Sequence, residues 1–301
     1  MRILWLGWED PYTPKRMLHA AASLGIELST LEISDVSFKA AGGSIGVYQN
    51  SRNLVEEHDA LIARTFYPHI SEALTIARLF HDAGKVVVDE SLTDEGFVVS
   101  KMHDYILLAA HGIEVPRTWQ FHDAAALAGQ ADKLGYPCVL KGVHGSHGTH
   151  VHLVRNHEEL MQRYAGYPAG ELMLQEYLPA DEDFRLLVVG YQALPLMVSR
   201  YPAPGDFRTN VAYSQSGSAY RINDFTGLVE LASRAARLLR REFAGVDIRY
   251  RRDKPVVLEV NRRPVFEHFE KVTGFDVAER FLSYVADKVI QHRHERTLVA
   301  L

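Results

Sequence analysis

The first third of the chain alternates short apolar runs with amphipathic segments. Runs of four or five apolar residues bounded by polar ones are typical of strands, whereas apolar residues that recur every three or four positions indicate a helix. The alternation predicts a small α/β sheet unit. The predicted strands are Arg2–Leu6, Ala60–Ala63 and Lys85–Val88, and the predicted helices are Pro14–Leu24 and Ser71–Asp82.

The middle of the chain has the pattern of a compact α+β unit. From Asp94 to His111 the apolar positions fit a helix, which Gly112 ends and Pro116 follows. Beyond it we predict a helix, two strands and a second helix, in the order Asp123–Leu134, Pro137–Lys141, Val151–Val154 and His157–Tyr164.

The last third contains the longest predicted strands and one strongly amphipathic helix. Between Phe225 and Leu239, apolar residues recur at the i, i+3, i+4 and i+7 spacing of a helix with one buried face. The polar stretch after Gln291 is expected to be a solvated helix end or a frayed tail. The predicted strands are Leu172–Tyr177, Phe184–Val189, Val246–Tyr250 and Val256–Val260. The whole chain is therefore predicted to be an α/β protein with α+β lobes.

Composition narrows the class of partner. With 301 residues the chain is long enough for two or three lobes, and a net charge of −5 gives no basic field that would draw it to nucleic acid or to an anionic membrane. No apolar run approaches the roughly 20 residues of a membrane-spanning helix, and the apolar run at the start of the chain is too short for a signal peptide. Cys138 is the single cysteine, which excludes an internal disulfide. We expect a cytoplasmic protein with a small-molecule or peptide substrate, and a homo-oligomer is compatible with the sequence.

A glycine-rich loop follows the strand that carries Lys141. In the segment PCVLKGVHGSHGTHV, exposed backbone N–H groups and the hydroxyl of Ser146 could bind phosphate oxygens, while Lys141 adds a positive charge. A β-hairpin with a glycine turn fits the same residues equally well. The loop lacks the G-K-[ST] ending of a P-loop, and the turn Leu6–Asp10 lacks the G-x-G-x-x-G run of a dinucleotide-binding fold.

Two acidic residues and an amide form a second candidate set. Asp247 lies in AGVDIRY, and Glu259 and Asn261 lie two apart in PVVLEVN, so that they share one face of a strand. Carboxylate and amide oxygens are the ligands that Mg²⁺ selects, usually alongside nucleotide phosphates. An acid at the solvated edge of a strand is the plainer interpretation of either carboxylate alone.

Polar residues between these two sets could hold a nucleotide. In LQEYLPADEDFRLLVVG, backbone groups of residues 176–178 could meet adenine, and Asp183 could accept a hydrogen bond from a ribose hydroxyl. In GDFRTN, Arg208 could neutralise charge on a transferred phosphoryl group, with Asn210 beside it. Taken alone, Arg208 could equally be an ordinary surface arginine.

The order of these segments resembles the ATP-grasp ligases of the RimK type. The order is VLK…GSHG, LQEY…DFRLLVVG, DFRTN, AGVDI and LEVN-x-x-P…E-K-x-T-G-x-D-x-A, and the resemblance spans about residues 95–285. The ordered set is far more specific than any one piece. It implies an ATP-grasp fold with an N-terminal pre-ATP-grasp α/β domain at residues 1–94. A central lid subdomain at 95–172 and a C-terminal subdomain at 173–301, with the nucleotide and metal site, would follow.

The resemblance also implies the role of each site residue. Arg185 and Arg208 are the expected catalytic residues, since they would contact the acyl phosphate and the γ-phosphate. The expected ATP-binding residues are Lys101, Lys141, Ser146, Gly148, Glu176, Tyr177, Leu178, Asp183 and Asn210. The expected ligands of Mg²⁺ or Mn²⁺ are Asp247, Glu259 and Asn261.

The activity implied is that of an ATP-dependent, ADP-forming carboxylate–amine ligase. Such an enzyme phosphorylates a carboxylate and lets an amine displace the phosphate. Here the carboxylate would belong to a small molecule, a peptide or a protein tail, and the amine to a glutamate-like amino acid. Two other classes stay open: an ATP-binding module without catalysis, and a metal-dependent hydrolase built on histidines. The presence of all the expected ligands argues against the first, and the second would act without ATP.

Two segments depart from the pattern of the family. Where relatives usually have N-x-S-P-G-x-E, this chain reads NRRPVFE, so Arg262 or Arg263 could pair with a carboxylate of an acidic substrate, or both could point to solvent. Arg64, from the N-terminal lobe, is expected to face the cleft in which the substrate would bind. In the glycine-rich loop, His150 stands where relatives have glycine. With three neighbours it forms a histidine cluster that could bind a transition metal or contact phosphate; the four are His144, His147, His150 and His152.

Overall fold

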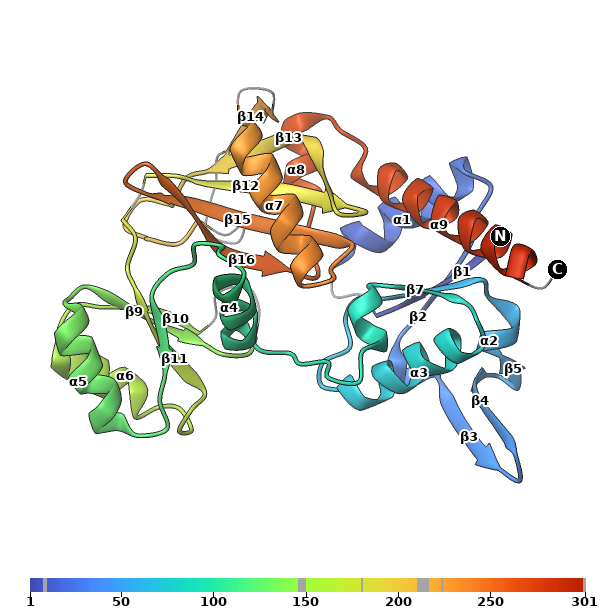
Figure 1. The fold of residues 1–301 in the computed structure, drawn as a ribbon, viewed down its shortest axis with the longest axis horizontal. Coiled ribbons are helices and arrows are strands. Elements are labelled where there is room, and N and C mark those ends of the chain that lie inside the picture. The colour runs from blue at the N-terminus through green and yellow to red at the C-terminus, as the bar shows by residue number, and fades with distance from the viewer. Residues whose placement is uncertain (8–9, 146–149, 180, 210–216, 223–224, 300–301) are drawn as a thin grey trace.

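The structure is a computed structural model, and it describes residues 1–7, 10–145, 150–179, 181–209, 217–222 and 225–299 (Figure 1). Within these residues three main sheets follow one another along the chain, and a small three-stranded sheet projects from the first (Figure 1). The predicted α/β class with several lobes is confirmed. None of the described helices is long and apolar enough to cross a membrane.

The N-terminal sheet is parallel and has the strand order β2-β1-β6-β7. Its strands are β1 (Arg2–Leu6), β2 (Glu27–Leu31), β6 (Ala60–Ala63) and β7 (Val86–Val88). The sequence did not predict β2, because this edge strand is only partly buried and mixes polar with apolar residues. The projecting sheet consists of β3 (Ser37–Ala41), β4 (Ser44–Gln49) and β5 (Arg52–Asn53), and the short helix α2 (Leu54–Glu57) follows it.

Alternating side chains of β1 fill the two cores on either side of this sheet. Ile3 and Trp5 pack with α1 (Tyr12–Ser23), whereas Leu4 and Leu6 pack with α3 (Ile70–Asp82). The pattern of strands and helices predicted for this part is confirmed in kind. Each helix begins one or two residues before its predicted start.

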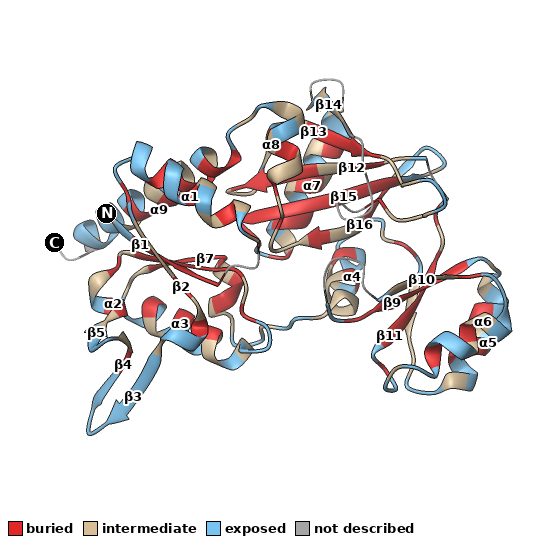
Figure 2. Cartoon of the chain, turned by 180° about the vertical axis from the view of Figure 1, so that it is seen from behind, coloured by how far each residue is buried: buried red, intermediate tan, exposed pale blue. Residues whose placement is uncertain are grey.

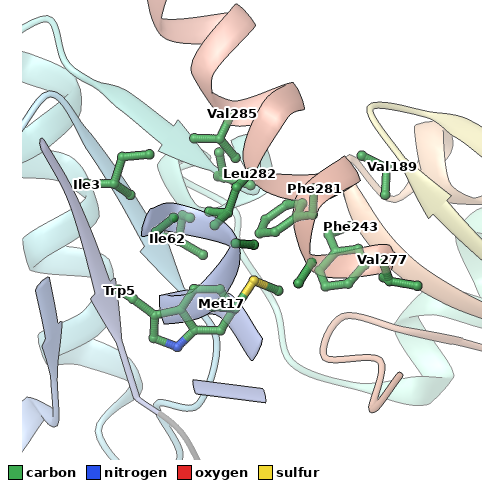
Figure 3. Packing of buried hydrophobic residues seen from close by; sticks show 14 of the residues in the cluster. Ile3, Trp5, Met17, Ile62, Val189, Phe243, Val277, Phe281, Leu282 and Val285 are labelled. Carbon is green, nitrogen blue, oxygen red and sulfur yellow. The ribbon is translucent and has the colours of Figure 1, made fainter. Parts of the chain in front are cut away.

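The C-terminal helix α9 (Val277–Val299) lies against the N-terminal sheet (Figures 1 and 3). The ring of Phe281 meets Trp5 edge to face, with centroids 6.4 Å apart, and stacks on Phe243 of the third sheet at 4.3 Å. The first and last parts of the chain therefore share one apolar core. The polar end of α9 is a largely exposed helix end, as one of the two predictions stated, and Arg293 ties it to Asp59 with an N–O distance of 2.6 Å.

The central sheet is antiparallel, with the order β10-β9-β11-β8. Its strands are β8 (Thr118–Gln120), β9 (Cys138–Gly142), β10 (Val151–Val154) and β11 (Leu172–Glu176). Two helices, α5 (Ala124–Leu134) and α6 (His157–Tyr164), share an apolar core with this sheet. Side chains of α4 (Lys101–Ala110) form a smaller cluster with Val143 and Met173.

The predicted helix from Asp94 to His111 is wrong in its first turns. A 3₁₀ helix ends at Thr93, and α4 begins only at Lys101. The hydroxyl of Ser100 accepts a hydrogen bond from the backbone N–H of His103, which caps the helix at that point.

The C-terminal sheet is antiparallel and has the order β14-β13-β12-β15-β16. Its strands are β12 (Asp183–Val189), β13 (Gln192–Arg200), β14 (Gly217–Arg221), β15 (Phe243–Arg251) and β16 (Lys254–Asn261). The amphipathic helix α7 (Thr226–Leu238) covers one face, and α8 (Glu267–Thr273) lies near the other (Figures 1 and 2). β13 and β14 were not predicted.

Candidate active site

A lysine of the central sheet meets a carboxylate of the C-terminal sheet. The Nζ atom of Lys141 lies 3.1 Å from Oε2 of Glu259 and 3.2 Å from the hydroxyl oxygen of Tyr105. The Nζ atom of Lys101, at the start of α4, lies 3.9 Å from Oε1 of the same carboxylate. Burial opposes ionisation of Glu259, but the two ammonium groups hold its pKa below the usual value. The structure thus brings together three residues that the sequence predicted for the site.

Asp247 is enclosed by arginines. Nε and Nη2 of Arg185 each donate to one of its carboxylate oxygens at 2.8 Å, and Nη2 of Arg200 lies 3.0 Å from Oδ1. Burial would raise the pKa of Asp247, but the two guanidinium groups lower it below its ordinary range. Arg200 was not among the predicted residues, although it also donates to both oxygens of Asp183 at 2.8 Å.

The three predicted metal ligands lie together on β15 and β16. Asp247 pairs directly with Glu259 across the two strands, and the side-chain amide of Asn261 donates to Oδ2 of Asp247 at 3.1 Å. Two carboxylates and an amide oxygen at this spacing fit the hard-oxygen ligand set of Mg²⁺. Because Asp247 already bonds two arginines, a metal would share this carboxylate with them.

The predicted adenosine-binding residues lie around the ends of β11 and β12. The buried carboxylate of Glu176 accepts from Arg117 and, at 2.7 Å, from Arg251, so it is turned toward these arginines. The backbone N–H of Glu176 also donates to the carbonyl oxygen of Arg117, at 2.9 Å. Asp183 is buried as well and bonds the hydroxyl of Thr209 in addition to Arg200.

Arg249 belongs to this region and was missed. Its Nη1 donates to the carbonyl oxygen of Leu178 at 2.8 Å, and its Nη2 lies 3.4 Å from the hydroxyl of Thr209. The signal was present in the sequence, because Arg249 lies two residues after Asp247 on one strand and therefore on the same face. Burial lowers the pKa of the guanidinium group.

Arg208 lies in the loop between β13 and β14. Its Nη2 donates to Oδ2 of Asp206 at 2.8 Å, and its Nε donates to Oδ1 at 3.0 Å. The ring of Tyr177 packs edge to face on Phe207 of the same loop, with centroids 6.1 Å apart. Three of the predicted ATP-binding residues, Ser146, Gly148 and Asn210, lie outside the described residues.

Arg64 and Arg262, predicted to meet the substrate, both bind Asp89. Nη1 of each arginine lies 3.2 Å from Oδ2 of this fully buried carboxylate. Only 1% of the Arg64 side chain and 14% of the Arg262 side chain are exposed. Arg263 instead donates from Nη1 to the hydroxyl of Thr65 at 2.9 Å. The alternative that Arg262 points to solvent is therefore wrong.

The described histidines of the glycine-rich loop turn toward a tyrosine. A ring nitrogen of His150 lies 3.1 Å from the hydroxyl of Tyr167, and one of His152 lies 2.8 Å from it. Burial lowers the pKa of His152, and the cations Arg163 and Arg208 act in the same direction. His144 is exposed, and His147 lies outside the described residues. In the part of the chain that the structure describes, no three His, Cys, Asp or Glu side chains group to hold a metal ion.

Residues 99–285 match the RimK-like ATP-grasp domain family. The probable alpha-L-glutamate ligase of Enterobacter sp. (strain 638) is 31% identical to this chain over 291 residues, and the match covers 91% of each protein. A ribosomal protein bS6–L-glutamate ligase of Escherichia coli is 30% identical over 285 residues, again with 91% of each protein covered.

Solved structures show the same fold at low identity. The ATP-grasp ligase PsnB, solved with a minimal precursor, has a TM-score of 0.71 at 19% identity and covers 97% of this chain, which in turn covers 98% of that chain. The RimK domain protein of Sphaerobacter thermophilus DSM 20745 has a TM-score of 0.68 at 20% identity, with 95% of this chain and all of that chain covered. The predicted ATP-grasp fold is confirmed. Since the family match spans more than half of the chain and relatives at 30% identity or above match nearly all of it, the chain belongs to the RimK-like ATP-grasp family and is an ATP-grasp ligase.

Proposed function

We propose that the chain is an ADP-forming carboxylate–amine ligase that uses ATP with Mg²⁺ or Mn²⁺ and forms an acyl phosphate. The observation that carries the proposal is the convergence of Lys101 and Lys141 on Glu259, beside the group of Asp247 and Asn261. The cations proposed to contact phosphates and the oxygens proposed to hold a metal then lie together where the central sheet contacts the C-terminal sheet. A PsnB structure with a precursor, Mg and ADP supports the choice of nucleotide and metal.

The charges of these residues suit phosphoryl transfer to a carboxylate. A carboxylate is a poor acceptor for an amine because its leaving group would be oxide, and phosphorylation makes that oxygen leave as phosphate. A metal held by Asp247, Glu259 and Asn261 would supply screening between the carboxylate and the triphosphate. Arg185 would stabilise the acyl phosphate, and its position on β12 directly opposite Asp247 supports this role.

The remaining predicted residues take roles around these groups. Arg208 would neutralise the transferred phosphoryl group, and backbone groups of residues 176–178 would hold adenine near Asp183. Arg249 would orient the adenosine segment through the carbonyl of Leu178, and Arg200 would orient the carboxylate of Asp183. In this proposal the chain divides into three domains, residues 1–94, 95–172 and 173–301, and the central one is the lid over the phosphates.

The relatives indicate the kind of substrate. One is named for joining L-glutamate to ribosomal protein bS6, and PsnB was solved with the precursor peptide PsnA2. We therefore propose an amino acid resembling glutamate as the amine and a carboxylate on a peptide, a protein tail or a small molecule as its partner. Arg263, which departs from the family pattern, makes an acidic co-substrate the first choice, because Arg262 is already paired with Asp89.

ADP release tests the proposal. The full chain is incubated with ATP and Mg²⁺ across a panel of carboxylates and amines, beside Glu259→Gln and the control Glu230→Gln, which alters an exposed residue of α7. We expect ADP formation that needs both co-substrates, falls at least 100-fold in Glu259→Gln and is unchanged in the control. ATP binding without turnover on any pair would support the module without catalysis instead, and activity without ATP would support the hydrolase.

A further inference from the structure

A histidine that the proposed function does not use lies over the site face of the C-terminal sheet. His268 is the second residue of α8, which follows β16 and packs on β13. Phe266 and Phe269, which flank it in the sequence, belong to one apolar cluster with Val198 of β13. Val198 lies directly opposite Arg185, so the two side chains share one face of the sheet. α8 therefore covers the face that carries the arginines and carboxylates of the proposed site.

Two buried nitrogen atoms on this face have no hydrogen-bond partner among the described residues. One is Nε2 of His268, and the other is Nη1 of Arg200, whose Nε and Nη2 atoms bond Asp183 and Asp247. Buried polar atoms are normally hydrogen-bonded, so both call for a polar group that the described residues do not supply. His268 as a whole is only partly buried, so a molecule bound at the site can reach this residue.

The described charges that act on His268 belong to cations. Burial lowers the pKa of the imidazole, and three cations act in the same direction: Arg200 on β13, Arg185 on β12 and Lys271 on α8 itself. His268 is therefore neutral near pH 7. One ring nitrogen of a neutral imidazole has a lone pair that accepts a proton.

The proposed reaction needs a proton acceptor close to the acyl phosphate. An amino acid arrives at neutral pH as an ammonium ion, which has no lone pair with which to attack a carbonyl carbon. The carboxylates of Asp247 and Glu259 are paired with cations, whereas His268 is neutral and unpaired at Nε2. His268 also lies within reach of the charge of Arg185, the residue proposed to stabilise the acyl phosphate.

We propose that His268 is the general base that takes a proton from the amine before the amine attacks the acyl phosphate. The proposal rests on the proposed function for the identity of the reaction. The proton passes from the ammonium group to Nε2, and the freed lone pair forms the C–N bond with the acyl carbon. The C–O bond to the phosphoryl group breaks, its electron pair leaves with phosphate, and the second amine proton passes to that phosphate.

Two amines that differ in their affinity for protons test this role. Hydroxylamine is mostly unprotonated at pH 7 and converts an acyl phosphate into a hydroxamate, whereas the amine of L-glutamate is protonated. ADP release is measured with each amine and with the carboxylate that the panel identifies. The proteins compared are the wild type, His268→Gln and the control His81→Gln, which alters an exposed residue of α3.

We expect His268→Gln to lower kcat at least 100-fold with L-glutamate and to keep it within about threefold with hydroxylamine, which needs no base. The control should be unchanged with both amines. Retained activity with hydroxylamine also shows that the variant is folded. Equal losses with the two amines would overturn the proposal, because removal of a proton would then not be what His268 contributes.

The pH dependence of kcat with L-glutamate gives a second readout. Between pH 7 and pH 9 the wild type should change little, because its base is already neutral. His268→Gln should gain up to about tenfold per pH unit over this range, as the fraction of unprotonated amine rises. The same steep rise in the wild type would overturn the proposal.

A measurement without turnover separates this inference from the proposed function. NMR follows the imidazole signal of His268 in the full chain as the pH is varied, and its absence from His268→Gln assigns it. The signal should titrate below the pKa of a histidine side chain in water. A higher value would overturn the base while leaving the ligase intact. If His268 titrates low but no carboxylate gives ADP with either amine, the proposed function fails and the reaction that His268 would serve fails with it.

Discussion

The Nζ atom of Lys141 lies 3.1 Å from Oε2 of Glu259 and so joins two different sheets, although the two residues are 118 apart in the sequence. The contact places a cation of the central sheet on a carboxylate of the last strand of the C-terminal sheet. The two opposite charges neutralise each other. In the proposed reaction a bound metal and nucleotide would take over both roles.

Replacing Lys141 by methionine should weaken both nucleotide binding and the fold. The variant leaves Glu259 with Lys101 as its remaining cation, so the free energy of unfolding should fall by about 1 to 3 kcal/mol. ATP affinity should fall at least tenfold, because a phosphate contact is lost. Urea unfolding and titration with ATP and Mg²⁺ measure the two effects. Unchanged ATP affinity would remove Lys141 from the proposed site.

Asp89 should be among the residues most important for stability. Its carboxylate is fully buried and accepts hydrogen bonds from Arg64, Arg262 and the backbone N–H groups of Glu242 and Phe243. Asp89→Asn removes one charge and leaves two buried guanidinium groups behind, so the free energy of unfolding should fall by about 3 kcal/mol or more.

The control for Asp89 is Asp82→Asn. Asp82 pairs with Arg78 on the surface of α3, with more than half of each side chain exposed. We expect the free energy of unfolding of Asp82→Asn, measured with urea, to change by about 0.5 kcal/mol or less. A similar loss in both variants would show that the buried pairing of Asp89 contributes no more than a surface ion pair.

The pKa of Asp247 should make the fold sensitive to acid. Arg185 and Arg200 hold this pKa at about 2, below the ordinary value, against the opposing effect of burial. Between about pH 4 and about pH 2 the unfolded chain therefore binds more protons at this position than the folded chain does, so stability falls as the pH is lowered.

Asp247→Asn should remove this part of the acid dependence. Urea unfolding at pH 7, 4 and 3 should give a shallower loss of stability on acidification for the variant than for the wild type, starting from a lower value at pH 7. Parallel profiles for the two proteins would mean that Asp247 has no depressed pKa in the folded chain.

Arg249 should affect the use of ATP although we do not expect it to touch the reacting groups. Arg249→Met takes the donor from the carbonyl of Leu178 and from the hydroxyl of Thr209, which loosens the segment proposed to hold adenine. KM for ATP should rise about 3- to 10-fold with a smaller change in kcat. Arg155→Met, which alters an exposed arginine near α6, is the matched control. A loss in kcat alone would place Arg249 in the chemical step.

The sequence was sufficient for those elements whose residues form a local pattern. β1 and β6 have the predicted bounds because each is a buried apolar run. β2 lies at an edge and mixes polar with apolar positions, so its pattern is weak. The first turns of the helix predicted from Asp94 failed because a helix cap at Ser100 outweighed apolar spacing.

The site divides in the same way. The grouping of Asp247, Glu259 and Asn261 was predictable, since two of them share one strand and the ordered motifs indicated the third. The binding of Arg64 and Arg262 to Asp89 was not predictable. Arg262 and Asp89 are 173 residues apart, and no local pattern encodes a contact at that separation. Arg249, which was not predicted, could have been assigned to the site from the alternation of side chains along its strand alone.

The shared core of the first and last segments has a consequence for synthesis of the protein. The face of the N-terminal sheet that carries Ile3 and Trp5 is completed only by α9, which begins at residue 277. While the ribosome makes the intervening residues, α1 alone covers this apolar face, and the part that α9 will bury is open to aggregation or to a chaperone. A chain that stops before α9 should therefore leave the ribosome with this face only partly covered, whatever the state of the two later sheets.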